Sequence, residues 1–469
     1  MAASSWCSRH SADVPLDAAR RRRQWSGRWG GSGWPVTVLS SNPATVRHRR
    51  SAAPVALLLA GLLAGCAGDV KGVLGPVAAG APGTSKVTML VATTRAPDAD
   101  EGVLFSGERG KSAFAEITVS LPPDEKRTIG EVQWPSRLPG NPATDFVTLK
   151  VDKLDRTAAL ARLHAAASKV PKRRVMVFIH GFNNRFEDAV YRFAQIVHDS
   201  GAEVVPVLFT WPSRGSIFAY GYDRESSNYS RHALENLLQA LARDPAVGEV
   251  SILAHSMGNW VTLEALTLMA IRNRGIPAKI ANVMLASPDV DVDVFRTQVK
   301  EMEGRKPKFT LFVSQDDRAL AVSRRVWGST ARLGAIDPDV EPYKSEMEAD
   351  KITVLNLTKL KSGDSLNHGK FAESPEVVKL IGTRLVSGQP ITDSRVGLGD
   401  RLIQATGSAA AAVGTAAGLV VSAPIAVIDP HTRNNFGDKV EELGRSIKDA
   451  GDATGQAVAA PLERASQQR

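Results

Sequence analysis

Ala254-His255-Ser256-Met257-Gly258 is a short turn between two strongly patterned segments. It follows the apolar run 250–253 and precedes the helix-forming segment 260–269. A serine at a sharp strand-to-helix turn, with a glycine two places on, is the arrangement that exposes a nucleophilic hydroxyl at the edge of a sheet. In the alternative interpretation Ser256 only caps the helix, since serine is a favoured N-cap residue. We predict that Ser256 is a nucleophile.

Strands and helices alternate around this turn. From residue 174 onward, near-continuous apolar strands are separated by segments with helical periodicity, which indicates a mainly parallel sheet with helices on both faces. Three earlier strands are expected to form an N-terminal antiparallel edge. The predicted strands are 87–92, 114–121, 146–151, 175–179, 204–210, 250–253, 283–286, 309–313 and 352–357, with a helix around 231–241.

A nucleophilic serine needs a histidine that removes its proton and an acid that orients this histidine. In α/β-hydrolases, whose nucleophile occupies such a turn, the chain order is nucleophile, acid, histidine. Only His368 and His431 follow Ser256, and His431 lies beyond a long uncharged segment. His368, in a loop after the last apolar strand, is therefore the predicted base. A solvated loop histidine is the alternative.

The acid is expected just after the strand 309–313, where Asp316 and Asp317 are adjacent candidates. One of the two is free to serve as a turn or helix-cap residue. Weaker candidates follow the preceding strand, and they equally suit helix capping or the lining of the site. These are Asp289, Asp291 and Asp293.

The developing oxyanion needs two preorganised N–H donors. We predict one from Met257, directly after the nucleophile, and one from Phe182 in the loop that follows the strand 175–179. Gly181 lets the backbone of this loop turn tightly, and His180 is expected to support the loop rather than to transfer protons. The segment 211–231 is aromatic and polar, and suits either a cap over an acyl pocket or a packed loop.

Several short motifs together resemble a largely uncharacterised bacterial α/β-hydrolase family of esterase/lipase-like proteins, many of them lipoproteins. The resemblance covers about residues 86–385 and implies a triad of Ser256, Asp317 and His368. It favours Asp317 over Asp316 and fixes no substrate. Ala254 departs from the first glycine of the wider G-x-S-x-G pattern, which a single methyl group tolerates. The motifs occupy 91–95, 180–184, 210–213, 254–258, 287–291 and 314–320.

Residues 1–65 are predicted to be a leader. They contain nine arginines, no lysine and two aspartates, and so carry +7 of the formal net charge of +9. The remaining chain is close to neutral, so the pI near 9.5 is no evidence for nucleic-acid binding, and we expect none. The segment 1–45 is unusual for a signal peptide, and a start at Val46 gives a compact leader.

Within this leader, arginines at 47, 49 and 50 precede the apolar segment 53–63, which is too short to span a bilayer. Small residues then lead to Cys66, and this pattern resembles the lipobox of bacterial lipoproteins. We predict that Cys66 is lipidated and that the protein is anchored in the cell envelope, facing the periplasm or the exterior. An ordinary secretory peptide or an uncleaved anchor are the alternatives.

The expected organisation is a leader at 1–65, a flexible tether at 66–85, a hydrolase domain at 86–390 and an Ala/Gly-rich tail at 391–469. The tail contains Leu402–Ile428, which is uncharged and long enough to span a membrane, although a membrane-associated or surface-packed helix fits its weak hydrophobicity better.

We predict a serine hydrolase that acts on a carboxylic ester or thioester, such as a lipid-like acyl ester. A metal-binding His-Glu-x-x-His pattern and a phosphate-binding loop are both absent from the sequence, so neither a metal nor a cofactor is expected. The alternatives are a catalytically silent lipoprotein that uses the fold for binding or envelope assembly, and a peptidase or acyltransferase with the same triad.

Overall fold

The computed structural model describes residues 70–302, 304–326, 330–360 and 364–382. The whole predicted leader, the first four residues of the tether with the predicted lipidation site Cys66, and the segment Leu402–Ile428 lie outside these ranges. Within the described ranges, no helix combines the length and the hydropathy that crossing a membrane requires.

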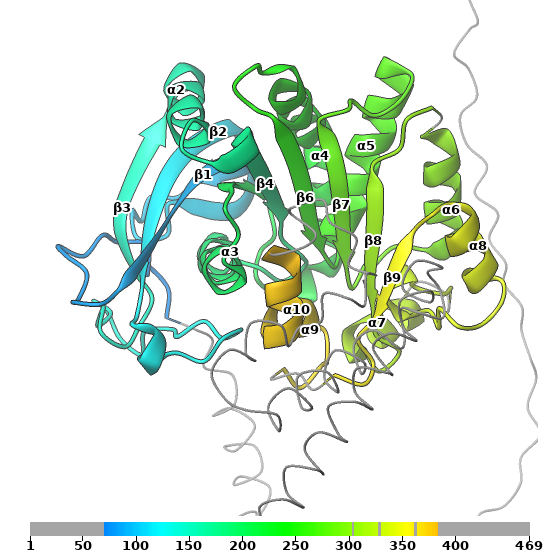
Figure 1. Ribbon diagram of the computed structural model, residues 1–469. Coiled ribbons are helices and arrows are strands. Elements are labelled where there is room, and N and C mark those ends of the chain that lie inside the picture. Colours follow the sequence, from blue (N-terminus) through cyan, green and yellow to red (C-terminus); the bar gives the residue numbers. More distant parts are fainter. Residues whose placement is uncertain (1–69, 303, 327–329, 361–363, 383–469) are drawn as a thin grey trace, which may run out of the picture. The chain divides into compact units, whose positions relative to one another are not determined.

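The described chain is built on one nine-stranded sheet with the order β3-β2-β1-β5-β4-β6-β7-β8-β9 (Figure 1). β1 pairs with β2, and β2 with β3, in antiparallel fashion, whereas all pairs from β1–β5 to β8–β9 are parallel. The mainly parallel sheet with an N-terminal antiparallel edge is therefore confirmed. The strands are β1 Ser85–Pro97, β2 Phe105–Leu121, β3 Val147–Leu154, β4 Arg174–Ile179, β5 Val205–Thr210, β6 Glu249–His255, β7 Ile280–Ala286, β8 Lys308–Val313 and β9 Thr353–Asn356.

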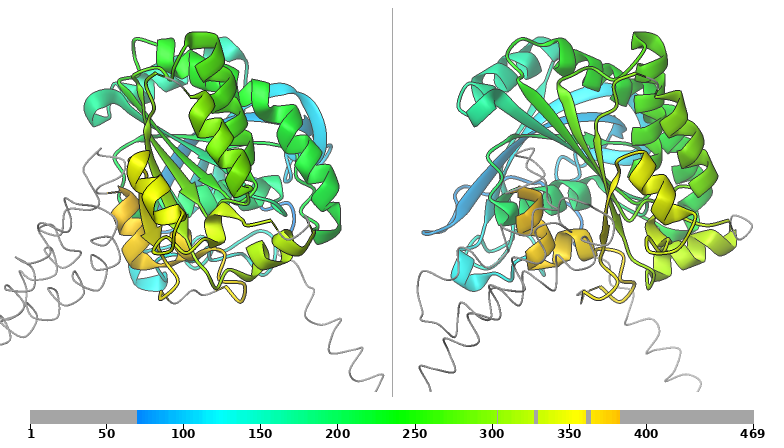
Figure 2. Two further views of the ribbon diagram at one scale, coloured as in Figure 1. Left: turned by 90° about the vertical axis from the view of Figure 1, so that its right-hand side faces the viewer. Right: turned by 45° about the vertical axis from the view of Figure 1, so that its right-hand side comes forward.

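Helices cover both faces of the sheet (Figure 2). In β4, Val175, Val177 and Ile179 enter one core, while Met176 and Phe178 enter the other, because successive side chains of a strand point to opposite faces. The first core contains α2, α4, α5, α6 and α8, and the second contains α3, α9 and α10. The helices are α2 Arg156–Ala167, α3 Phe186–Ser200, α4 Tyr220–Arg243, α5 Gly258–Asn273, α6 Val292–Glu301, α7 Arg318–Val326, α8 Tyr343–Ala349, α9 Lys370–Glu373 and α10 Pro375–Leu380.

Two segments differ from the sequence expectations. The helix predicted around 231–241 begins eleven residues earlier, at Tyr220, because polar residues in its first half are buried against neighbouring loops, Asp223 and Ser226 among them. Of the expected flexible tether 66–85, the described residues 70–85 include a packed segment. Its apolar residues Val73 and Leu74 are buried in the second core, and the Val73 carbonyl accepts a hydrogen bond from Tyr191 Oη.

Candidate active site

Ser256 occupies the tight turn between β6 and α5. Its φ of +52° is in the left-handed region, which is rare for a non-glycine residue and is found where the surrounding structure imposes it. The Ser256 N–H donates to the Ala286 carbonyl of the neighbouring strand β7 over 3.0 Å. The N-cap residue of α5 is Met257, and no side chain caps this helix. The capping interpretation of Ser256 is therefore wrong.

The loop 180–184 lies directly against this turn. A Cβ on Gly181 would lie 2.8 Å from Ser256 Cβ, and a Cβ on Gly258 would lie 2.4 Å from the His180 carbonyl oxygen. Both contacts are closer than side chains allow, so the two glycines let the loop and the turn meet. The loop comes from the carboxyl end of β4, which is the neighbour of β6 in the sheet.

The two predicted oxyanion donors lie on either side of this contact. Phe182 directly follows Gly181, and Met257 directly follows Ser256. Among the described residues, neither the Phe182 N–H nor the Met257 N–H donates a hydrogen bond to a protein acceptor. Most backbone N–H groups of a folded protein are paired, so two unpaired donors beside a strained serine are notable. The arrangement suits the binding of an oxyanion.

A buried guanidinium holds the loop in place. Arg95, on β1, donates from Nη2 to the Asn184 carbonyl over 2.8 Å and from Nη1 to the Ser213 carbonyl over 2.8 Å. Its Nη2 also lies 3.3 Å from His180 Nε2. Complete burial lowers the pKa of Arg95 to about 10, against the opposing charge of Asp223. Arg95 is thus a positioning residue for the loop that carries Phe182.

His180 supports the same loop, as the sequence suggested. Its ring is buried, stacks on Trp211 and has Nδ1 placed 2.8 Å from the Gly181 carbonyl oxygen. The Trp211 N–H donates to Nε2 over 3.2 Å. Burial and the nearby Arg95 charge lower the pKa of His180 to about 3, so the ring stays neutral. A neutral, fully bonded imidazole is structural rather than proton-transferring.

His368 and Asp317 are in direct contact in the site. His368 Nδ1 lies 2.7 Å from Asp317 Oδ2, and the Asp317 side chain is buried. The other carboxylate oxygen, Oδ1, accepts the N–H of Leu320 over 2.9 Å. Burial by itself lowers the pKa of His368, but the hydrogen bond and charge of Asp317, together with the charges of Asp289 and Asp364, raise it above its ordinary value.

Asp316 points away from His368. Its carboxylate pairs with Lys370 Nζ at 2.8 Å and accepts the Ser314 hydroxyl. The hydrogen bonds from Lys370 and Ser314 outweigh burial and lower the pKa of Asp316. Asp316 therefore anchors α9 to the end of β8 rather than orienting the histidine.

The other acidic candidates also do not contact His368. Asp291 caps α6 by accepting the N–H groups of Asp293 and Val294, and Asp293 pairs with Arg296. Asp289 instead lies in the pocket beside Ser256 and accepts the hydroxyls described below. The sequence suggested these aspartates as helix caps or site-lining residues. Asp291 is a helix cap, and Asp289 lines the site.

Ser256, His368 and Phe182 line one pocket of about 750 Å³. Among the described residues, no hydrogen bond joins the Ser256 hydroxyl to His368. Such bonds are often long before substrate binds. At one part of the wall, Asp289 accepts hydrogen bonds from Tyr220 Oη over 2.7 Å and from Ser323 Oγ over 2.6 Å. Apolar side chains form much of the remaining wall, and they include Phe178, Phe182, Ile217, Leu320, Val322 and Leu366.

The segment 211–231 was predicted to be either a cap over the pocket or a packed loop, and different parts of it fit each prediction. Ile217 and Tyr220 line the pocket, as a cap would. Tyr222 and Tyr229 instead donate to the carbonyls of Gly107 and Gly110 on β2. The first part of α4 is thus a wall of the pocket on one side and packs on the sheet edge on the other.

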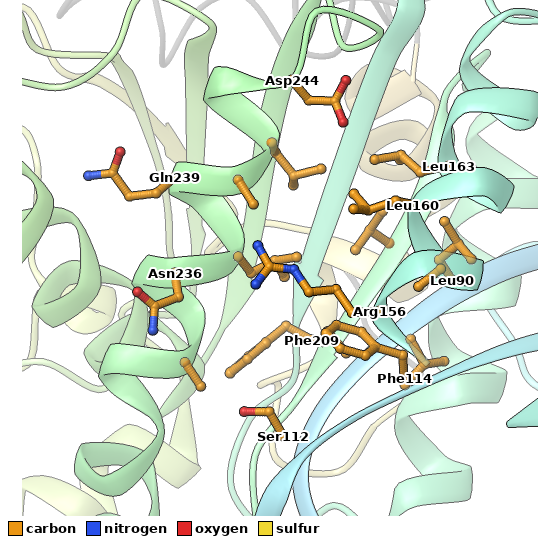
Figure 3. A pocket seen from close by; sticks show the side chains of 18 of the residues that line it. Leu90, Ser112, Phe114, Arg156, Leu160, Leu163, Phe209, Asn236, Gln239 and Asp244 are labelled. Carbon is orange, nitrogen blue, oxygen red and sulfur yellow. The ribbon is translucent and has the colours of Figure 1, made fainter. Parts of the chain in front are cut away.

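A second pocket, of about 880 Å³, lies between α2 and α4 over β1, β2 and β5 (Figure 3). It contains the hydrogen-bonded pair His164 and Asp244. Ser112 and Asp244 lie at opposite ends of this pocket in Figure 3, so no serine there stands beside the pair. We therefore place the candidate chemistry in the smaller pocket, which contains Ser256.

Two features of the site were not found from sequence. The role of Arg95 was missed, although an arginine inside an apolar strand is a signal of a buried ion. The hydrogen bonds of Asp289 to Tyr220 and Ser323 join residues far apart in the chain, and no local pattern indicates them. Within the described ranges, no three His, Cys, Asp or Glu side chains gather as a metal site.

A comparison with known protein families agrees with this fold. Residues 155–384 match the model of a family described as "Alpha/beta hydrolase of unknown function (DUF900)". These residues include Ser256, Asp317, His368 and both predicted oxyanion donors. No curated protein matches the chain.

Proposed function

Because residues 155–384 belong to an alpha/beta-hydrolase family of unknown function, we propose that the chain is a serine hydrolase of carboxylic esters or thioesters. One observation carries the proposal. A strained serine with two unpaired N–H groups at its side shares a pocket with a histidine that is hydrogen-bonded to a buried aspartate. Each part has a use in acyl transfer, and a binding protein needs none of them together.

In the proposed reaction, His368 Nε2 takes the proton of the Ser256 hydroxyl while Oγ attacks the acyl carbon. The carbonyl oxygen becomes an oxyanion that accepts the N–H groups of Phe182 and Met257. Asp317 stabilises the imidazolium through Nδ1. The tetrahedral intermediate then expels the alcohol or thiol, which takes the proton from His368 and leaves an acyl-enzyme.

Water completes the cycle. His368 removes a proton from a water molecule, whose oxygen attacks the acyl carbon at the same position. The second tetrahedral intermediate expels Ser256 Oγ, which recovers its proton from His368, and the carboxylic acid leaves. Apolar walls at Phe182, Leu320 and Leu366 suit an apolar acyl or alcohol group.

The test uses a fluorophosphonate probe and a short chromogenic acyl ester. We expect the wild type to be labelled and to hydrolyse the ester, and Ser256→Ala to do neither. Ser251→Ala is a matched control, because Ser251 is a buried serine on β6 that does not line the pocket. Equal labelling of wild type and Ser256→Ala contradicts the nucleophile assignment. Absence of turnover at every acyl length favours a binding role.

We further propose that Cys66 is lipidated and anchors the protein in the cell envelope, as its preceding sequence suggests. Metabolic incorporation of a fatty-acid analogue tests this. We expect incorporation into the wild type and none into Cys66→Ser, with Cys7→Ser as the matched control. Equal incorporation into all three chains contradicts the proposal.

A further inference from the structure

The mouth of the Ser256 pocket is surrounded by exposed apolar side chains. Ile217, Val322, Val326 and Leu366 line the pocket and are 66%, 57%, 62% and 49% exposed. Phe218, next to Ile217, is 93% exposed. These five residues are half of the ten large hydrophobic side chains that are exposed in the described chain. We call them the apolar rim.

Three separate segments contribute to the apolar rim: the turn before α4, the helix α7 and the loop that precedes His368. Single exposed apolar side chains are common on protein surfaces, but a group of them around one opening indicates an interaction surface. A hydroxyl-rich or charged rim would serve a polar substrate equally well. Because exposing this apolar rim to water is unfavourable, we expect an apolar partner at the pocket mouth.

The helix α7 adds positive charge to the rim. Arg324 and Arg325 are exposed and, among the described residues, form no ion pair and no hydrogen bond. Val322 and Val326, one helical turn apart, share a face of the same helix. Apolar side chains flanked by unpaired arginines suit an interface with anionic lipid, since the valines enter the acyl region and the guanidinium groups reach the phosphates.

We propose that the apolar rim and α7 dock the protein on an anionic lipid bilayer, with the Ser256 pocket open toward the lipid. A protein partner seated on this rim would close the pocket mouth, whereas a bilayer would supply an acyl substrate through it. The inferred substrate class, an ester held in a membrane, rests on the proposed function. The docking surface itself does not depend on catalysis.

Site-directed fluorescence tests the docking surface in the full-length chain. Cys7→Ser and Cys66→Ser together remove both native thiols and prevent lipidation. An environment-sensitive fluorophore is then attached at Phe218→Cys or, as a matched control, at Ile271→Cys. Ile271 is 60% exposed on α5 and does not line the pocket.

On phosphatidylglycerol vesicles, we expect blue-shifted, brighter emission at position 218 and no change at 271. No change at 218, or equal changes at both positions, overturns the proposal. Protection of position 218 from an aqueous quencher before vesicles are added also overturns it, because another part of the chain or a second copy then covers the rim.

Vesicle sedimentation measures the contributions of the two features. In the same background without Cys7 and Cys66, we expect Phe218→Ser and the double variant Arg324→Gln/Arg325→Gln each to weaken binding to phosphatidylglycerol vesicles by about tenfold. The double variant should also lose the preference over phosphatidylcholine vesicles. Ile271→Ser is expected to bind like the wild type. Unchanged binding in both rim variants contradicts the proposed surface.

Hydrolysis separates the two proposals. We expect Phe218→Ser to cleave a water-soluble short ester like the wild type and to cleave an ester presented in vesicles about tenfold more slowly. If the wild type cleaves the soluble ester but does not bind vesicles, only the docking proposal fails. If the wild type cleaves neither ester while position 218 responds to vesicles, only the proposed function fails.

Discussion

Asp317→Asn is the substitution that tests the proposed histidine orientation most directly. Asp317 Oδ1 accepts the Leu320 N–H, and Oδ2 lies 2.7 Å from His368 Nδ1. In Asp317→Asn, the amide oxygen has to remain on the Leu320 N–H, because Leu320 is buried and, within the described ranges, this N–H has no other acceptor. The amide NH₂ therefore points at His368 Nδ1.

This geometry predicts the wrong tautomer of the imidazole. An NH₂ donor opposite Nδ1 requires Nδ1 to be an acceptor, which places the ring proton on Nε2. Nε2 then has no lone pair with which to take the Ser256 proton. The loss of the correct tautomer and of the carboxylate charge costs about 5 kcal/mol in the transition state, or roughly 10³- to 10⁴-fold in kcat.

Asp316→Asn is the matched control, since it changes the adjacent aspartate in the same way. Lys370, which pairs with Asp316, keeps the Ser314 hydroxyl and the Leu357 carbonyl as partners, and Asp316 is partly exposed. We expect a loss of about 1–2 kcal/mol in the free energy of unfolding. The kcat of Asp316→Asn should stay within about tenfold of the wild type.

The assay is steady-state hydrolysis of a soluble ester, with urea unfolding of each variant alongside. We expect opposite outcomes for the two variants: Asp317→Asn loses activity and keeps its stability, and Asp316→Asn keeps most of its activity and loses stability. A larger activity loss in Asp316→Asn refutes the assignment of the acid. Full activity in Asp317→Asn refutes the tautomer argument.

Three further predictions concern the base, the loop contact and the buried guanidinium. The pKa of His368 is raised, and its neutral form is the base, so kcat/KM should fall as the pH drops through a midpoint above 6.5. Asp317→Asn should lower that midpoint. A wild-type midpoint below 6.5 contradicts the raised pKa. Gly181→Ala places a methyl group 2.8 Å from Ser256 Cβ, so kcat for the soluble ester should fall by about 10²-fold. Gly201→Ala is the control, because no atom lies near the added Cβ, and this variant should be fully active in the same assay. Arg95→Met should lower the free energy of unfolding in urea by about 3–5 kcal/mol, because the Asp223 charge loses a nearby buried cation and three carbonyls lose their hydrogen-bond donor. Arg109→Met, at an exposed position, should change the free energy of unfolding by less than about 1 kcal/mol. Equal effects of the two substitutions contradict the positioning role of Arg95.

Hydrophobic periodicity was sufficient to predict all nine strands of the sheet. Each predicted strand overlaps an observed one, because a strand's hydrophobic pattern is local, and the buried parallel strands are in addition apolar on both faces. The start of α4 was less predictable. Its first turns contain serine, tyrosine and charged residues that favour no periodicity, and they become helical because their polar groups are satisfied by distant loops, as Asp223 is by Ser213.

The same division applies to the candidate site. The serine turn and its glycine are local, so their spacing alone indicated the position of Ser256. The choice between Asp316 and Asp317 rested on a family resemblance, because adjacent residues have the same spacing from any strand. It is the backbone after β8 that turns Asp317 toward His368 and Asp316 toward Lys370.

The strand-to-helix turn at 254–258, the order of the strands' apolar runs and the position of His368 after the last strand all follow from residues close together in the chain. Three other features depend on segments that meet only when the sheet is assembled. They are the hydrogen bonds by which Arg95 holds the loop 180–184, the placement of the Phe182 and Met257 N–H groups beside Ser256, and the apolar rim. Side-chain direction at such meetings is set by packing between elements, and sequence patterns record only the periodicity within each element.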